Sequence, residues 1–127
     1  MAMRTKRLRQ LIKLQEKLKA IHETRHATHL RDALAAQAEA DEIARLADEA
    51  SPLAGLFPGL HERRITSAHE RKAEMTELAE QEARKIAAQE ARADVIRRNY
   101  RDALRHEERA SAEKEILELL SRPGQGK

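Results

Sequence analysis

The chain has no cysteine and little of what builds an ordinary globular core. Its 127 residues include no Cys and no Trp, one Phe, one Tyr, four Gly and three Pro. Without Cys, disulfides and thiolate chemistry are excluded, which suits a reducing compartment. With aromatic residues at only 2%, we do not expect a large packed core, because aromatic side chains supply much of the apolar area that such cores bury.

Long apolar runs are also absent from the sequence. No segment approaches the roughly 18 apolar residues that a membrane-spanning helix needs. Near the N-terminus, charged residues interrupt every apolar stretch, so this end does not have the pattern of a secretory signal. We therefore expect a soluble, cytoplasmic protein.

Charged residues, in contrast, are abundant and nearly balanced. They make up 37% of the chain, with 25 Lys and Arg against 22 Asp and Glu. A composition dominated by Ala, Glu, Arg, Leu and Lys is typical of long helices and coiled coils. The basic excess lies early, where only Glu16 opposes Arg4, Lys6, Arg7, Arg9, Lys13, Lys17 and Lys19. That end suits an acidic protein surface, phosphates or an anionic membrane.

A long apolar stripe predicts a helix over about residues 60–121. The sixteen positions that alternate in steps of three and four are Ile65, Ala68, Lys72, Met75, Ala79, Glu82, Ile86, Gln89, Ala93, Ile96, Tyr100, Ala103, Glu107, Ala110, Lys114 and Leu117. Eleven of them are apolar, in a chain that is 40% apolar. A repeat of about 3.5 residues keeps one face against a partner helix when the pair supercoils.

A first helix is predicted over about residues 4–49. Its apolar stripe begins with Leu11, Leu14, Leu18 and Ile21. It then shifts out of strict register, which predicts a stutter that locally relaxes the supercoil. The shifted positions are Ala27, Leu30, Leu34, Ala38, Ile43, Leu46 and Ala50.

Between the helices, residues 50–59 contain two Pro and two Gly, which predicts a tight reversal. The fold class is therefore all-α, a single long antiparallel two-helix coiled-coil hairpin with a frayed tail over 122–127. Facing residues should have numbers that add to about 110, so that Leu14 faces Ile96 and Leu34 faces Met75. The apolar side chains of the loop, Leu53, Leu56 and Phe57, either cap the helix interface or form an exposed contact patch.

The same register leaves the end of the second helix without a neighbour. Residues 107–121 should project roughly 20 Å beyond the first helix at 1.5 Å per residue. This projecting end carries Ile116, Leu117, Leu119 and Leu120. Such apolar residues need a partner, either another chain or the basic N-terminal turns. We select Arg4, Arg7, Leu117 and Leu120 as the candidate partner-binding residues.

One local motif suggests metal chemistry. His22-Glu23-Thr24-Arg25-His26 has the H-E-x-x-H pattern, in which two His one turn apart bind zinc and the Glu acts as a base. His29 lies three residues further on. A two-helix rod offers no ligand from another direction and no walled cleft, so His22, His26 and His29 are only weak metal candidates. The favoured interpretation is a solvated or partner-facing His stripe that gains charge between about pH 7 and 5.

No other catalytic or cofactor-binding pattern is present. The sequence has no Gly-rich phosphate loop, and its Ser residues lack activating neighbours. Nucleic-acid binding is disfavoured, because acidic residues are interleaved with the basic ones and no stacking aromatics accompany them. We expect no enzymatic activity, no cofactor and no nucleic-acid partner.

Both ends of the chain resemble one protein family. The opening segment K-R-L-R-Q-L-I-K-L-Q-E-K-L-K-A, residues 6–20, is similar to the start of FliJ-type flagellar export proteins and of the related YscO-type injectisome proteins. The Arg- and Glu-rich run over residues 99–119 resembles their C-terminal segment. Length and two-helix layout agree over nearly the whole chain, although this chain is somewhat short and has an apolar Pro/Gly loop.

The resemblance implies a coiled-coil stalk that enters the hole of a hexameric export ATPase with the end that carries both termini. It also implies contacts of the mid-hairpin surface with the export gate and with export chaperones. The location would be cytoplasmic and peripheral at the inner membrane through these partners. The competing hypotheses are a generic coiled-coil scaffold or chaperone that dimerises into a four-helix bundle, and a hydrolase built on the His motif.

Overall fold

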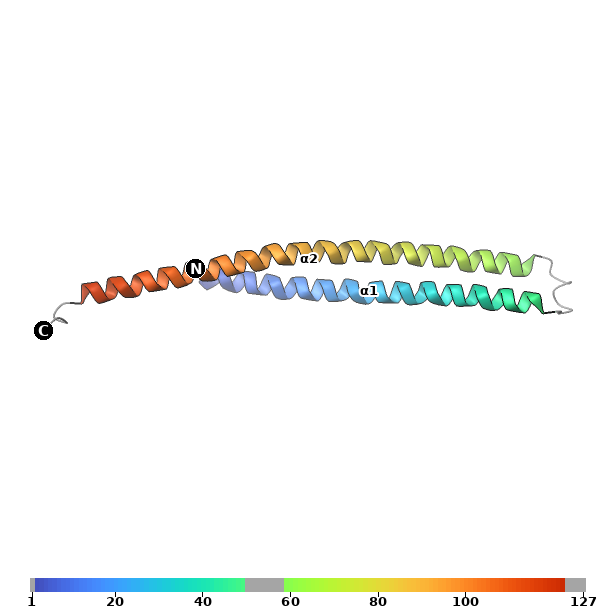
Figure 1. Cartoon of the computed structure of the whole chain (residues 1–127), viewed down its shortest axis with the longest axis horizontal. Coiled ribbons are helices and arrows are strands. Elements are labelled where there is room, and N and C mark those ends of the chain that lie inside the picture. The colour runs from blue at the N-terminus through green and yellow to red at the C-terminus, as the bar shows by residue number, and fades with distance from the viewer. Residues whose placement is uncertain (1, 50–58, 123–127) are drawn as a thin grey trace. The chain divides into compact units, whose positions relative to one another are not determined.

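The computed structural model describes residues 2–49 and 59–122, and this part of the chain is 97% helical without strands. Helix α1 runs over Ala2–Asp48 and helix α2 over Leu60–Ser121 (Figure 1). The prediction of an all-α helical hairpin is confirmed. Both helices have nearly the predicted bounds, because Ala, Leu, Glu, Lys and Arg are strong helix formers and neither helix contains Pro or Gly.

The start of α2 shows why a glycine precedes it. Gly59 has a φ of +78°, a left-handed conformation that costs a residue with a side chain more than it costs glycine. Its carbonyl accepts the hydrogen bond from the Arg63 N–H at 3.0 Å, which closes the first turn of the helix. The predicted reversal and its apolar side chains, over 50–58, lie outside the described residues, as does the tail from residue 123 on.

The contacts of the backbone divide the chain into two compact units. We call Met1–Leu18 with Gln89–Lys127 the terminal unit, and Lys19–Ala88 the inner unit. In the terminal unit Thr5 bonds to Glu107 and Glu16 pairs with Arg97, while in the inner unit Glu39 pairs with Arg71. As the residue numbers increase along α1, the residue numbers of their partners on α2 decrease. The helices are antiparallel within each unit, close to the predicted register.

The predicted face of α2 is the one that packs against α1. Every stripe position from Ile65 to Glu107 is buried or half-buried except Lys72, which is exposed. The most covered of these positions are mostly small, because short side chains let two helices approach closely. They are Ala68, Ala79, Glu82, Ala93 and Ala103.

The predicted face of α1 is wrong over most of its length, although Ile43 is buried as expected. Of the leucines expected at the interface, Leu18 is half-buried, but the others are 40–72% exposed, among them Leu14 at 48% and Leu34 at 72%. The proposed Leu34–Met75 pair is therefore not buried in this hairpin, and Leu14 lies at most at the edge of the helix interface. Instead, α1 covers a neighbouring line of positions: Thr5, Leu8, Ile12, Gln15, Lys19, His22, His26, His29, Ala33, Ala36, Ala40 and Ile43.

Two physical reasons favour this line. Its positions alternate in steps of three and four from Thr5 to Ile43 without interruption, so no stutter is needed to hold one face against α2. Its residues also suit those of α2, since in the inner unit small Ala side chains are buried on both helices and His22 meets the buried Glu82. The predicted stutter is therefore absent from the described part of α1.

Candidate functional site

The projecting end of α2 is present in the terminal unit. Glu107 bonds to Thr5 near the start of α1, and every described residue after Glu107 is exposed. In Figure 1 the orange-to-red end of α2 continues past the start of α1. We call residues 110–121 the overhang; at 1.5 Å per residue it is about 18 Å long. Its last turn is closed by a hydrogen bond from the Ser121 hydroxyl to the Glu118 carbonyl at 3.1 Å.

The overhang has one broad apolar face. At about 100° per residue, its four large apolar side chains span roughly half of the helix circumference. Glu115 and Glu118 lie on the opposite side together with Arg122. The four apolar residues and their exposed fractions are Ile116 (56%), Leu117 (65%), Leu119 (60%) and Leu120 (78%). A helix end of this kind is suited to packing in an apolar groove of another molecule.

The candidate residues Arg4 and Arg7 lie in the first turns of α1 and are exposed. Their helix is held beside α2 by the Thr5–Glu107 hydrogen bond and by Arg9, whose guanidinium bonds to the Tyr100 hydroxyl at 3.2 Å. The Arg9 guanidinium also lies 5.9 Å from the centre of the Tyr100 ring, within the range of a cation–π contact.

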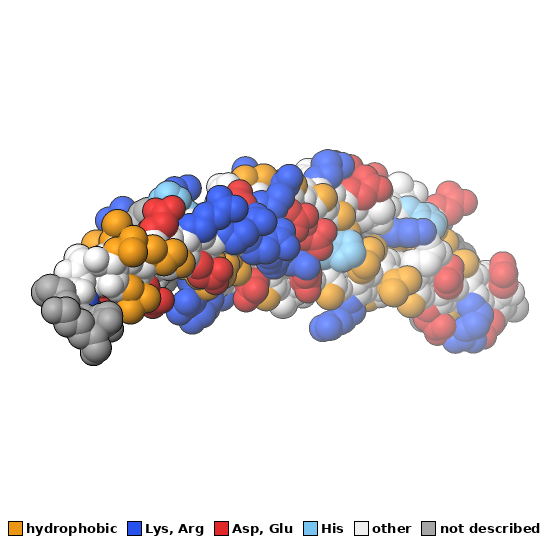
Figure 2. All heavy atoms as spheres, turned by 60° about the vertical axis from the view of Figure 1, so that its left-hand side comes forward, with side chains coloured by type: hydrophobic (Ala, Val, Ile, Leu, Met, Phe, Trp, Pro, Cys, Tyr) orange, Lys and Arg blue, Asp and Glu red, His pale blue; other side chains and the backbone are white. Residues whose placement is uncertain are grey.

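The four candidate residues do not form one cluster. Leu117 lies ten residues beyond Glu107, which amounts to about 15 Å along the helix axis. Arg4 and Arg7 therefore belong to a basic patch beside the base of the overhang, while Leu117 and Leu120 belong to its apolar end. Figure 2, in which the terminal unit is turned toward the viewer, shows a large area of Lys and Arg behind the apolar side chains of the chain end.

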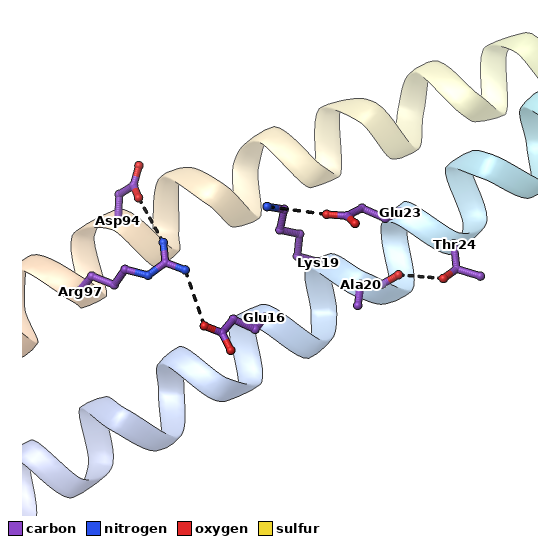
Figure 3. A network of polar contacts seen from close by, with 7 residues as sticks. All are labelled: Glu16, Lys19, Ala20, Glu23, Thr24, Asp94 and Arg97. Atoms are coloured by element: carbon purple, nitrogen blue, oxygen red, sulfur yellow. Dashed lines mark hydrogen bonds and ion pairs between the residues drawn. The ribbon is translucent and has the colours of Figure 1, made fainter.

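Some of the Arg side chains on α2 are already paired. Arg97 lies between Asp94 at 3.3 Å and Glu16 of α1 at 3.8 Å (Figure 3), and Arg105 pairs with Asp102. An open depression on the helix surface is lined by Arg98, Arg101, Asp102, Leu104, Arg105 and Glu108. Because its lining mixes both signs of charge, the depression gives no particular support to a phosphate site.

The His motif is divided between the helix interface and the surface. His22, His26 and His29 are half-buried, so they do not form a fully solvated stripe. Glu23, the would-be base, is 54% exposed and pairs with Lys19 at 3.7 Å (Figure 3). Among the described residues, no group of three or more His, Asp or Glu side chains is placed to hold a metal ion.

A polar pair that the sequence analysis missed lies in this interface. The Nδ1 of His22 is 2.7 Å from Oε2 of Glu82, and the side chains are only 14% and 8% exposed. Burial raises the pKa of Glu82, but the hydrogen bond with His22 and the charge of Lys85 at 3.5 Å together hold the pKa below its ordinary value of 4.5. The signal for this pair was Glu82 itself, a carboxylate in the middle of the predicted apolar face.

A second surface that the sequence analysis did not predict lies on α1. In the terminal unit the side chains of Leu11 and Leu14 are 42% and 48% exposed, and Leu18 is half-buried. With Arg4 and Arg7 they follow one another in steps of three and four, which places all five on one face of the helix. We call these five residues the leucine stripe.

Comparison with known proteins does not assign this chain to a family. No protein-family model, curated protein sequence or solved structure matches the chain. Within residues 2–49 and 59–122, neither helix combines the length and the apolar character that crossing a bilayer requires.

Proposed function

We propose that this chain is a non-enzymatic stalk or coupling component of the bacterial flagellar, or type III, protein export apparatus. Its partners would be the export ATPase ring, the export gate and the export chaperones. Its location would be cytoplasmic, with attachment to the inner membrane only through these partners. The resemblance of residues 6–20 and 99–119 to FliJ-type and YscO-type proteins motivates the proposal.

The observation that carries the proposal is the exposed overhang beside the basic start of α1. Four large apolar side chains at 56–78% exposure are costly to leave in water, at about 25 cal/mol per Å² of apolar surface, and no other helix covers them within residues 2–49 and 59–122. Insertion into a ring would cover them, and the exposed Arg4 and Arg7 would meet acidic groups at its mouth. A helix pair with a mostly charged surface needs few tight contacts to act as a stalk.

The test uses the export ATPase encoded in the same genome. We expect the purified chain to bind the ATPase in a pull-down and to stimulate ATP hydrolysis. The double variant Leu117→Ser/Leu120→Ser should weaken binding about tenfold or more, because it removes two anchor side chains. Leu30→Ser/Leu34→Ser, which changes two exposed leucines of the inner unit, is the matched control. Absence of both binding and stimulation for the unaltered chain would refute the proposal.

A second candidate function is a coiled-coil scaffold or chaperone that dimerises into a four-helix bundle. The exposed leucines of α1 favour it, because leucines in steps of three and four are the usual contacts between helices of a bundle. Light scattering on the purified chain separates the two proposals. A monomer at micromolar concentration contradicts the scaffold, while a stable dimer supports it.

A further inference from the structure

The leucine stripe is a surface of α1 that the hairpin itself leaves largely uncovered. Arg4, Arg7, Leu11, Leu14 and Leu18 occupy successive turns of one face of α1 in the terminal unit. The positions that meet α2 belong to the neighbouring line, which includes Ile12 and Gln15 and is covered in the folded chain. The stripe therefore runs alongside the intramolecular interface, and only Leu18 at its end is half-buried.

The interface of the terminal unit buries glutamine side chains while leucines beside it stay exposed, which is unusual. Within the described part of the terminal unit, the Oε1 atoms of Gln15 and Gln89 are buried without a hydrogen-bond partner, while Leu11 and Leu14 remain 42% and 48% exposed. Burying a polar atom without a partner costs free energy, and leaving leucine side chains exposed to water adds a further cost. A helix that turned its leucines toward α2 would cover them and would move Gln15 out of the interface. The arrangement is explained if the leucines are covered by another molecule.

The charge around the stripe indicates what that molecule carries. Residues 4–18 contain six basic side chains, namely Arg4, Lys6, Arg7, Arg9, Lys13 and Lys17, against the single acidic residue Glu16. Glu16 is itself paired with Arg97 of α2 at 3.8 Å. Of the six basic side chains, Arg4 and Arg7 lie on the stripe itself and Lys17 lies at its margin, whereas Lys6, Arg9 and Lys13 lie on the other side of the helix. A partner that covers the leucines would therefore face Arg4, Arg7 and Lys17, which acidic side chains at its flanks would neutralise.

We propose that the leucine stripe binds an acidic amphipathic helix of a partner protein. Apolar side chains of that helix would pack against Leu11, Leu14 and Leu18 at matching steps of three and four, and its carboxylates would pair with Arg4, Arg7 and Lys17. This inference does not depend on a role in protein export. It concerns a different surface of the terminal unit from the apolar face of the overhang.

A second copy of the chain suits the stripe less well than an acidic partner does. Packing two stripes on each other would bring together two sets of Arg4, Arg7 and Lys17, with no acidic residue among the five members of either stripe, and like charges repel at short distance. The overhang of a second copy could cover the leucines, but it contributes only Glu113, Glu115 and Glu118, offset by Lys114. The charge of the stripe therefore favours a more acidic helix.

The experiment measures binding of designed peptides to the whole chain by fluorescence anisotropy. The probe is a fluorescein-labelled peptide of about 20 residues with leucines in steps of three and four and glutamates on the other faces. A scrambled peptide of the same composition reports attraction by charge alone. Leu11→Ser/Leu14→Ser removes the anchors, Arg4→Glu/Arg7→Glu reverses the charge but keeps the leucines, and Leu30→Ser/Leu34→Ser is the control. Circular dichroism verifies that each variant remains helical, and light scattering gives its oligomeric state.

We expect saturable binding of the amphipathic peptide that weakens about tenfold in each of the first two variants, remains unchanged in the control and weakens with added salt. Three results would overturn the proposal. They are no binding of the amphipathic peptide, equal binding of the scrambled peptide, and a dimer of the unaltered chain that Leu11→Ser/Leu14→Ser converts to monomer. The third result would assign the stripe to a second copy.

Discussion

The pair between His22 and Glu82 offers a sharp test of the interface in the inner unit. Replacing Glu82 by Ala removes a carboxylate that is 8% exposed and leaves the His22 ring, 14% exposed, without its acceptor at 2.7 Å. A hydrogen bond to a charged group contributes about 1.5–3 kcal/mol, and a fully buried pair is worth more when one partner is lost. Because solvent is close on both sides of a helix pair, we expect a loss of about 2 kcal/mol in the free energy of unfolding.

The matched control is Glu77→Ala, the same substitution on the same helix. The Glu77 side chain is 58% exposed and its ion pair with Arg84, at 3.6 Å, lies on the surface, where such pairs contribute little. Both variants gain the same helix propensity, so the difference between them isolates the buried pair. Urea unfolding followed by circular dichroism measures this difference, and a cycle with His22→Ala measures the coupling between the two residues, expected at about 1 kcal/mol. Equal unfolding midpoints for the two Glu variants, or zero coupling, would refute the interface assigned to α1.

Two further predictions concern the same unit. The pKa of Glu82 lies below its ordinary value of 4.5, so its contribution to stability is complete above about pH 4.5 and is lost as the pH falls through the lowered pKa. The stability difference between the unaltered chain and Glu82→Ala should therefore shrink below about pH 4.5 in urea titrations, and a constant difference down to about pH 3 would contradict this. Ala68 is fully buried, so Ala68→Leu should cost about 1–3 kcal/mol by overpacking. Ala73→Leu, at an exposed position, should change the urea midpoint little, and equal midpoints for the two variants would contradict the packing.

Sequence reasoning found α2 and its packing face because that helix offers a single stripe. Its apolar positions recur without a competing line from Ile65 to Tyr100, and the structure covers nearly all of them. The overhang followed from arithmetic alone, since 1.5 Å per residue and an antiparallel register leave the longer helix unpaired at its end. The bond between Thr5 and Glu107 confirms where the pairing stops.

The face of α1 could not be found in the same way, because two parallel lines of residues both alternate in steps of three and four. Apolar character selects the line through Leu11 and Leu14, whereas the folded hairpin covers the line through Ile12 and His22. What decides between them is the partner helix, which presents polar groups such as Glu82 at the interface and needs polar groups opposite. The uninterrupted spacing of the covered line was a second signal, because only that line keeps its steps of three and four residues without a stutter.

The same mistake explains why the His residues were misassigned. With the leucines placed at the interface, His22, His26 and His29 had to face outward, and a solvated stripe followed. Their half-buried positions against α2 instead make them part of what holds the helices together. The proposed function, by contrast, rests on the resemblance of the two chain ends to FliJ-type and YscO-type proteins and on the exposed surfaces. The described helix pair offers no enclosed site from which a chemical activity could be inferred.

The central claim is that α1 turns its His- and Ala-containing line toward α2 and leaves most of its leucines, among them Leu14 and Leu34, exposed. It is tested most directly by thiol accessibility. The chain has no Cys, so single cysteines can be introduced one at a time at Leu14, Leu34, Ala36 and Ala40 and their rates of alkylation compared in native buffer and in urea. Leu14→Cys and Leu34→Cys should react in buffer nearly as fast as in urea, while Ala36→Cys and Ala40→Cys, at 4% and 2% exposure, should be strongly protected. Protection of the two leucine positions with rapid alkylation of the two alanine positions would contradict the account.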